Sequence, residues 1–145
     1  MKELEKRSNK KNGFWVSKQY KRVFERKLEV LRKMNIDVKK VKIIVTVPVE
    51  NSEEVRSAIC DEGAGIIGNY TYCTISTKCI GTFKPSDNAN PYIGEKNKLE
   101  FVEEEKLETR CDINIVKRVL KRLREVHPYE EPVIDIIPLI DEDDL

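Results

Sequence analysis

The stretch VKIIVTVPV, residues 41–49, decides the fold because it is the clearest strand in the chain. Branched apolar residues fill most of its positions, as is typical of a central strand with a covered face. Pro48 has no backbone N–H to donate, so we expect strand pairing to stop there. The folded part of the chain therefore opens with a strand.

A helix is predicted directly after this strand. Asn51 and Glu54 have the spacing of a capping box, in which each side chain bonds the backbone of the other residue. Val55 and Ile59 lie one turn apart and supply an apolar face. Gly63 then ends the helix, because glycine readily adopts the left-handed conformation that follows a last turn.

Five more segments complete the predicted order. Residues 70–79, YTYCTISTKC, are rich in Thr, Tyr and Ile and predict a strand. Residues 84–98 concentrate Pro, Gly, Asn, Asp and Ser and predict a long loop. Residues 98–111 alternate between apolar and polar side chains and predict a further, long strand with glutamates on the solvent side. A helix capped by Asp112 and a final strand at 133–139 follow.

The resulting order, β-α-β-β-α-β, is that of the ferredoxin-like class of α+β folds. This class has an antiparallel sheet with two helices on one face. In a domain of about 100 residues, the other face of the sheet is often covered by another subunit. We therefore expect a homo-oligomer.

Residues 1–40 form a basic N-terminal arm ahead of the predicted domain at 41–140 and an acidic tail at 141–145. Residues 1–42 carry 15 Lys or Arg and 5 Asp or Glu, whereas the remainder carries 12 and 21. Apolar side chains spaced three and four apart predict an amphipathic helix in the arm; they are Tyr20, Val23, Phe24, Leu28, Leu31 and Met34.

This arm could bind nucleic acid through released counterions, or it could pair with the acidic body of a neighbouring subunit. It lacks aromatic residues interleaved with its charges and matches no nucleic-acid motif. We therefore favour pairing within an oligomer, or simple solubility, over nucleic-acid binding.

Composition points to a cytoplasmic protein. Charged residues make up 37% of the chain, and no apolar run approaches the roughly 18 residues that cross a membrane. The charged start lacks the apolar core of a secretory signal. The four cysteines at positions 60, 73, 79 and 111 show no CxxC spacing, so we expect free thiols.

Glycines 63, 65 and 68 surround the turn between the first helix and the next strand. They do not form a dinucleotide fingerprint, which lies between a strand and the following helix. The structural interpretation is a turn whose backbone needs positive φ. The functional alternative is a small-anion cleft lined by the amides of residues 65–69, the hydroxyl of Tyr70 and the thiol of Cys73.

His127 is the only histidine, and it precedes Pro128 at the end of the last helix. It could cap helix carbonyls and interact with the helix dipole. It could instead hold a metal ion with thiols and a carboxylate, or act as an acid or base with Glu130 or Glu131. No activated nucleophile with a base and an orienting third group is present, so we expect a non-enzymatic protein.

Four stretches resemble the YqfO-type domain, a PII- and CutA-like module of the Nif-three-like superfamily. They are VPVENSEEVRSAICDEGAGIIGNYTYC, GTFKPSDNANPYIGE, KLEFVEEEKLET and HPYEEPVIDIIPL, and together they extend over about residues 41–140. HPYEEP is also similar, more weakly, to the HPYEVP segment of CutA-type copper-tolerance proteins.

The resemblance implies a ferredoxin-like fold that assembles through its sheets, commonly as trimers with clefts between subunits. It also implies a stand-alone form, because the flanking halves that carry the family's dinuclear metal centre are not recognised in this chain. Cys79 departs from the family pattern, which usually has a small residue nearby. The positions that match the pattern are Gly63, Gly65, Gly68, Asn69, Tyr70, Cys73, Gly81, Thr82, Phe83, Pro85, Pro91, Gly94, His127, Pro128, Tyr129, Glu130 and Pro132.

We therefore expect a module that binds a small ligand or a protein partner in one cleft. The turn at 65–73, the loop at 82–95 and the corner at 127–131 would form this cleft. One alternative is a copper- or divalent-cation-responsive protein with His127 and Cys73 as ligands, and a second is nucleic-acid binding by the arm. The predicted ligand-binding residues are Gly65, Gly68, Asn69, Tyr70, Cys73, Thr82, Phe83, His127, Tyr129 and Glu130.

Overall fold

The computed structural model describes residues 25–27, 29, 30, 33 and 37–145. The chain divides into two compact units, residues 1–37 and residues 38–145. In the first unit, the described residues 25–27, 29, 30 and 33 are helical. The apolar stripe predicted for the arm, from Tyr20 to Met34, lies outside the described residues.

Strand β1, Lys40–Pro48, is the centre of the second unit. Val41, Ile43, Val45 and Val47 alternate along it and are almost completely buried. The intervening side chains point to the opposite face of the sheet, because successive residues of a strand point to opposite sides. Burial of this single apolar row fixes which face of β1 meets the helices.

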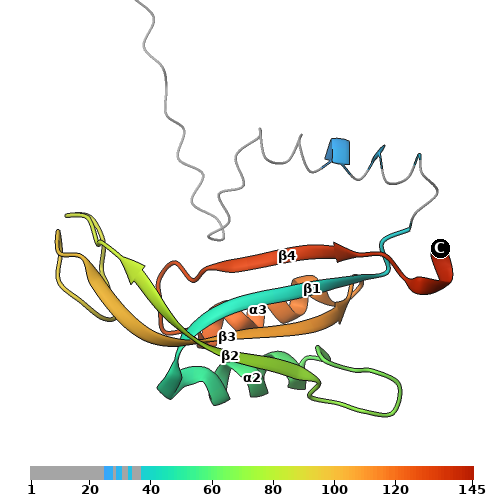
Figure 1. Cartoon of the computed structure of the whole chain (residues 1–145), viewed down its shortest axis with the longest axis horizontal. Coiled ribbons are helices and arrows are strands. Elements are labelled where there is room, and N and C mark those ends of the chain that lie inside the picture. The colour runs from blue at the N-terminus through green and yellow to red at the C-terminus, as the bar shows by residue number, and fades with distance from the viewer. Residues whose placement is uncertain (1–24, 28, 31–32, 34–36) are drawn as a thin grey trace, which may run out of the picture. The chain divides into compact units, whose positions relative to one another are not determined.

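The other three strands are β2 (Thr74–Phe83), β3 (Glu100–Asp112) and β4 (Ile134–Leu139). They form one sheet with the order β2-β3-β1-β4, and every neighbouring pair is antiparallel (Figure 1). This order confirms the predicted ferredoxin-like topology.

Helices α2 (Ser52–Asp61) and α3 (Val116–Val126) cover the valine face of β1. Val55 and Ile59 of α2 and Val119 and Leu123 of α3 are fully buried, and they share one core with the buried residues of β1. The opposite surface of the sheet, which we call the open face, carries no helix among the described residues.

Strand β2 begins four residues later than predicted and continues to Phe83. The chain reverses first, with positive φ at Gly65 (73°), Gly68 (56°) and Tyr72 (59°). An extended strand requires negative φ, so β2 starts only after Tyr72. It continues beyond the predicted end at Cys79 because Gly81 and Phe83 pair with Val102 and Glu100 across the hairpin.

Both predicted helix caps were wrong in detail. A 3-10 turn, η1 (Val49–Asn51), runs directly into α2, so Asn51 has helical φ and makes no side-chain cap bond. Helix α3 begins at Val116 after Ile115 rather than after Asp112. Asp112 instead accepts hydrogen bonds from the backbone and side chain of Asn114.

The C-terminal residues Glu142–Asp144 form a 3-10 turn, η2, which Asp141 caps by accepting a hydrogen bond from the backbone of Asp143. Among the described residues, no helix has the length and apolar character required to cross a lipid bilayer.

Candidate functional site

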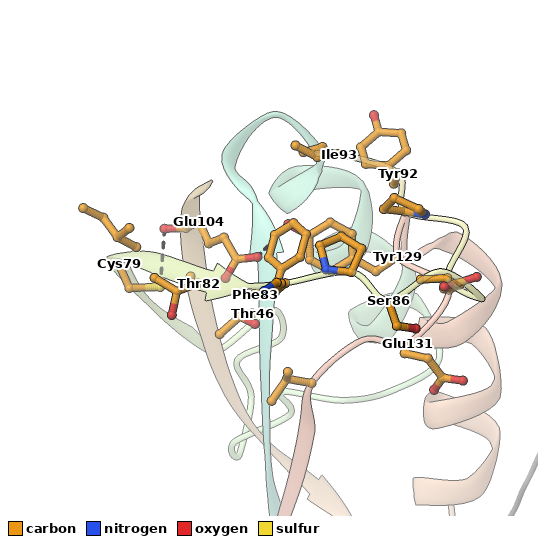
Figure 2. Close-up of a pocket in the computed structure, with 18 of the residues that line it drawn as sticks. Thr46, Cys79, Thr82, Phe83, Ser86, Tyr92, Ile93, Glu104, Tyr129 and Glu131 are labelled. Atoms are coloured by element: carbon orange, nitrogen blue, oxygen red, sulfur yellow. Dashed lines mark hydrogen bonds between the residues drawn. The ribbon is translucent and has the colours of Figure 1, made fainter. Parts of the chain in front are cut away.

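A hollow of about 660 Å³ lies on the open face of the sheet, at the end where β2 turns toward β3 (Figure 2). Its floor contains Thr46 of β1, Glu104 and Lys106 of β3, and Cys79 and Gly81 of β2. Thr46 alternates with the buried Val45 and Val47, and the residues beside it across the strands share its face of the sheet, away from the core. The volume lies within the range of about 300–1,000 Å³ found for small-molecule sites.

Two irregular segments form the walls of the hollow. The β2–β3 loop contributes Pro85, Ala89 and Tyr92, and the α3–β4 connection contributes Tyr129 and Val133. The loop and the connection are tied together because the backbone N–H of Asn90 donates to Glu130. Both segments leave the same end of the sheet, so the walls follow directly from the topology.

Three aromatic rings meet in this hollow. The centroid of the Tyr129 ring lies 6.2 Å from that of Phe83 and 6.4 Å from that of Tyr92, and the rings are tilted against each other. Such separations are typical of favourable aromatic pairs. The Tyr129 hydroxyl donates a 2.7 Å hydrogen bond to Glu104. Burial and this hydrogen bond raise the pKa of Tyr129 above its ordinary range, so the hydroxyl stays protonated.

Glu104 is the buried acid of the hollow, with only 5% of its surface exposed. Its carboxylate points toward Phe83 and Tyr129 (Figure 2). Gly81 makes this position possible, because a Cβ there would lie 2.3 Å from Oε2 of Glu104. The absence of a side chain at Gly81 therefore leaves the space that the Glu104 carboxylate occupies.

His127 lies behind the hollow and holds the corner in place. It is 6% exposed. Its Nε2 donates to the carbonyl of Thr46 at 2.8 Å, and its Nδ1 accepts from the backbone N–H of Tyr129 at 3.1 Å. Desolvation by burial lowers the pKa of His127, which favours the neutral ring that these two bonds require.

The two hydrogen bonds leave neither ring nitrogen of His127 with a free lone pair for a metal ion or a substrate proton. The ring bonds the backbone of β1, whereas the backbone N–H of His127 caps α3 by donating to the carbonyl of Leu123 at 2.9 Å. The thiol of Cys73, the second predicted metal ligand, donates to the carbonyl of Thr71 at 3.8 Å. Among residues 37–145, no three His, Cys, Asp or Glu side chains come together as a group that could hold a metal ion.

The glycine turn at 63–73 is held by its own backbone. The N–H of Gly65 donates to Arg110, and its carbonyl accepts from Cys73. The N–H of Ile67 donates to Tyr70. These amides are therefore not available to an anion, and the positive φ angles at Gly63, Gly65 and Gly68 agree with the structural interpretation of the turn.

The predicted single cleft does not form within one chain. Thr82, Phe83, Tyr129 and Glu130 line the hollow, with His127 directly behind them. The other half of the predicted set lies before the start of β2, whereas the hollow lies at the opposite end of this strand. The residues before β2 are Gly65, Gly68, Asn69, Tyr70 and Cys73. A ten-residue strand at about 3.4 Å per residue separates the two ends by about 30 Å.

Glu104, Gly81 and Tyr92 were not predicted as a site. Glu104 lies in the acidic run at 103–105, and the sequence analysis predicted that these glutamates face solvent. The available signal was the alternation with Leu107, which places Glu104 on the open face of the sheet. Its burial there depends on a wall that comes from the distant α3–β4 connection, which local patterning does not reveal.

The four cysteines are free thiols. Burial raises the pKa of both Cys60 and Cys111 to about 11, so these two thiols are protonated at neutral pH. The thiol of Cys79, at the floor of the hollow, donates to the carbonyl of Glu104 at 3.6 Å. Cys73 directly precedes β2, whereas Cys79 lies in the second half of that strand.

The sheet order and the two helices define an α+β module of the ferredoxin-like class. No family model matches the chain. Over 101 residues it is 46% identical to a protein of Halalkalibacterium halodurans named GTP cyclohydrolase 1 type 2 homolog; the match covers 70% of this chain and 27% of that protein. A Bacillus subtilis protein of the same name is 46% identical over 98 residues, covering 68% of this chain and 26% of the relative.

Solved structures agree with this similarity. A Bacillus cereus protein related to NIF3 has a TM-score of 0.62 and 41% identity, covering 71% of this chain and 26% of that one. CutA from Synechococcus elongatus has a TM-score of 0.54 and 13% identity, covering 72% and 80%, which shows the fold alone. This chain is thus homologous to a segment that makes up about a quarter of longer NIF3-related proteins.

Proposed function

We propose that this chain is a non-enzymatic PII/CutA-like module that binds a small ligand in the hollow on its open face, within a homo-oligomer. The observation that carries the proposal is the 660 Å³ hollow with three aromatic rings, a buried acid and a histidine-braced wall. Mostly apolar lining with a few oriented polar groups is typical of small-molecule sites.

The structure gives reasons to prefer a binding role over the alternatives. The two nitrogens of His127 are engaged with backbone groups, which weighs against the copper- or divalent-cation-responsive alternative. The nucleic-acid alternative depends on residues 1–42, most of which lie outside the described part, and it remains a prediction. The named activity of the longer relatives belongs to proteins of which this chain matches about a quarter.

The oligomer would explain why the predicted cleft has two halves at opposite ends of β2. The turn before β2 exposes several apolar side chains; they are Ile66, Ile67, Tyr70 and Tyr72. On the open face, Ile75 is 62% exposed in the single chain. Exposed apolar groups of this kind often mark contacts between subunits. In a head-to-tail ring, the turn of one copy would approach the hollow of the next.

We expect this chain to have a mass several times 16.9 kDa in solution, with a trimer as the favoured state. Light scattering coupled to size-exclusion chromatography at micromolar concentration measures this mass directly. Substitution of Tyr70 by Asp should lower it, because a charge would have to be buried at the contact. A wild-type mass of a single chain would contradict the oligomer but not the hollow as a binding site.

Ligand binding is tested by a thermal-shift screen with nucleotides, metabolites and metal salts. A ligand at 100 times its dissociation constant stabilises the folded state by about 2.7 kcal/mol, which gives a clear shift. Ala89→Phe should abolish the shift because Ala89 lines the hollow. Asn88→Phe is the matched control, since Asn88 is the neighbour of Ala89 in the same loop and does not line the hollow.

The two variants should have the same melting temperature without ligand, so any difference with ligand reports on the hollow. Equal shifts in both variants would place the ligand elsewhere on the chain. The absence of any shift across the whole panel would contradict small-ligand binding and favour a purely structural module.

A further inference from the structure

Glu104 is a buried acid without a cation beside it. Its direct cross-strand neighbours are Pro48 on β1 and Cys79 on β2, neither of which carries positive charge. Lys106, the next residue on the same face of β3, pairs with Glu108 at 3.5 Å. Among the described residues, Glu104 takes part in no ion pair within 4.0 Å, and its one side-chain partner is the neutral hydroxyl of Tyr129.

A buried carboxylate without a compensating charge destabilises a fold unless something brings positive charge to it. The side chain of Glu104 is not turned into solvent, where this cost would be avoided. Instead, Gly81 leaves the space for the carboxylate and Tyr129 holds Oε1 in place. The acid is therefore oriented toward the hollow. Its second oxygen, Oε2, accepts no hydrogen bond from the described side chains.

Three aromatic rings line the same space. Phe83, Tyr129 and Tyr92 lie on one side of the hollow, and the carboxylate of Glu104 points to the first two (Figure 2). Ring faces attract cations through their quadrupole, and this attraction grows when water is excluded. A carboxylate beside aromatic rings is thus the combination that recognises an ammonium or guanidinium group on an apolar body.

The remaining charges of the hollow give a net negative balance. Glu104, Glu130 and Glu131 contribute three acids, and Lys84 and Lys106 contribute two bases. Lys106 is already paired, and Lys84 is exposed. An anionic ligand that reached the floor would meet Glu104 before it met an unpaired lysine.

We propose that the hollow selects a small organic cation, whose ammonium or guanidinium group pairs with Glu104 while its apolar body packs against Phe83, Tyr92 and Tyr129. This inference rests on the proposed small-ligand site and adds the chemical class of the ligand. A protein partner could present an ammonium or guanidinium group to Glu104 only at the end of a long side chain. The volume of about 660 Å³ favours a free small molecule.

Three probes of similar shape and different charge test the inference: benzylamine, benzyl alcohol and phenylacetate. Binding is followed by NMR titration of the backbone amides of Gly81 and Thr82 at neutral pH. We expect the wild-type protein to bind benzylamine at least about tenfold more tightly than benzyl alcohol, and phenylacetate most weakly. Glu104→Gln should reduce the preference for the amine to about threefold or less, because the amide can still accept from Tyr129 but carries no charge.

Glu103→Gln is the matched control, since Glu103 is the exposed neighbour on the other face of β3. It should leave the preference unchanged. Equal binding of all three probes by the wild-type protein, or a preference for phenylacetate, would overturn the cation inference while leaving a ligand site in the hollow. Failure of benzylamine to bind would overturn it as well, whether or not the Glu104 variant folds.

The ligand panel with Ala89→Phe and Asn88→Phe separates this failure from that of the binding function. If the panel gives a hit that only Ala89→Phe removes, the hollow binds a ligand of another class. If the panel gives none, both the site and its selectivity are contradicted.

Discussion

Gly65→Ala is expected to lower the free energy of unfolding by about 3 kcal/mol, and Gly68→Ala by only about 1 kcal/mol. Both glycines have positive φ, at 73° and 56°. Each substitution therefore incurs the cost of about 1–2 kcal/mol that an L side chain has in the left-handed region. The difference between the two variants arises from what surrounds each glycine.

A Cβ at Gly65 would lie 2.9 Å from the nitrogen and 3.0 Å from the oxygen of Cys73, and 3.0 Å from Oγ1 of Thr109. Two of these atoms are backbone and do not move cheaply. Relief of the clash would also weaken the bonds that Gly65 makes to Arg110 and Cys73. At Gly68 a Cβ would meet nothing within 4 Å.

Urea unfolding of both variants at one protein concentration measures the two free energies. The fixed concentration matters because dissociation of an oligomer would otherwise contribute to the result. Similar losses in the two variants would contradict the close backbone approach at Gly65. They would show instead that positive φ alone determines the need for glycine in this turn.

The fold was predictable because its signals are local. The apolar row of β1, the three-and-four spacing in α2 and α3, and the loop composition at 84–98 each specify one element. The order of those elements then leaves few arrangements of one sheet. The four-residue error at the start of β2 arose from Tyr72, because a non-glycine residue with positive φ is rare and has no composition signal.

The candidate site was predictable only in part. Thr82, Phe83, Tyr129 and Glu130 were selected from motifs, and the structure places all four around one hollow. The turn at 65–73 was assigned to the same cleft because it is also rich in glycine. The topology would have separated them, since a turn that precedes β2 and a loop that follows it lie at opposite ends of that strand.

The functional interpretation of His127 shows why a motif does not reveal its chemistry. HPYEEP places a histidine, a tyrosine and two acids together in the sequence, which is compatible with a metal or acid–base site. In the fold, the histidine faces β1 and the tyrosine faces Glu104. The motif therefore holds the wall of the hollow, and the acid that enters the site comes from β3.

His127→Ala is accordingly expected to destabilise the protein by about 3 kcal/mol at neutral pH. The substitution leaves the carbonyl of Thr46 and the N–H of Tyr129 without their partners, and each buried unsatisfied group costs about 1–3 kcal/mol. Loss of the ring beside Tyr129, 5.2 Å away between centroids, adds a packing term. Glu131→Ala, at an exposed position of the same connection, should change the unfolding free energy by less than about 0.5 kcal/mol.

The effect of His127→Ala should shrink as the solution becomes acidic. The pKa of His127 is lower in the folded state than its ordinary value of about 6.5, so the unfolded chain binds more protons between the two values. The contribution of the neutral ring is therefore fully present above about pH 6.5 and is lost progressively below it. Urea unfolding of the wild type and the variant at about pH 7.5 and pH 5.5 measures this difference.

A metal role for His127 predicts that the stability of the protein depends on added metal. Copper or zinc bound to His127 would stabilise the wild type and not the variant, and the metal stoichiometry would fall by one in His127→Ala. Because both ring nitrogens are bonded to the backbone, we expect equal stoichiometry in the two proteins. A loss of one bound metal ion, or an effect of the substitution that is independent of pH, would show that the ring is not the neutral brace that its hydrogen bonds indicate.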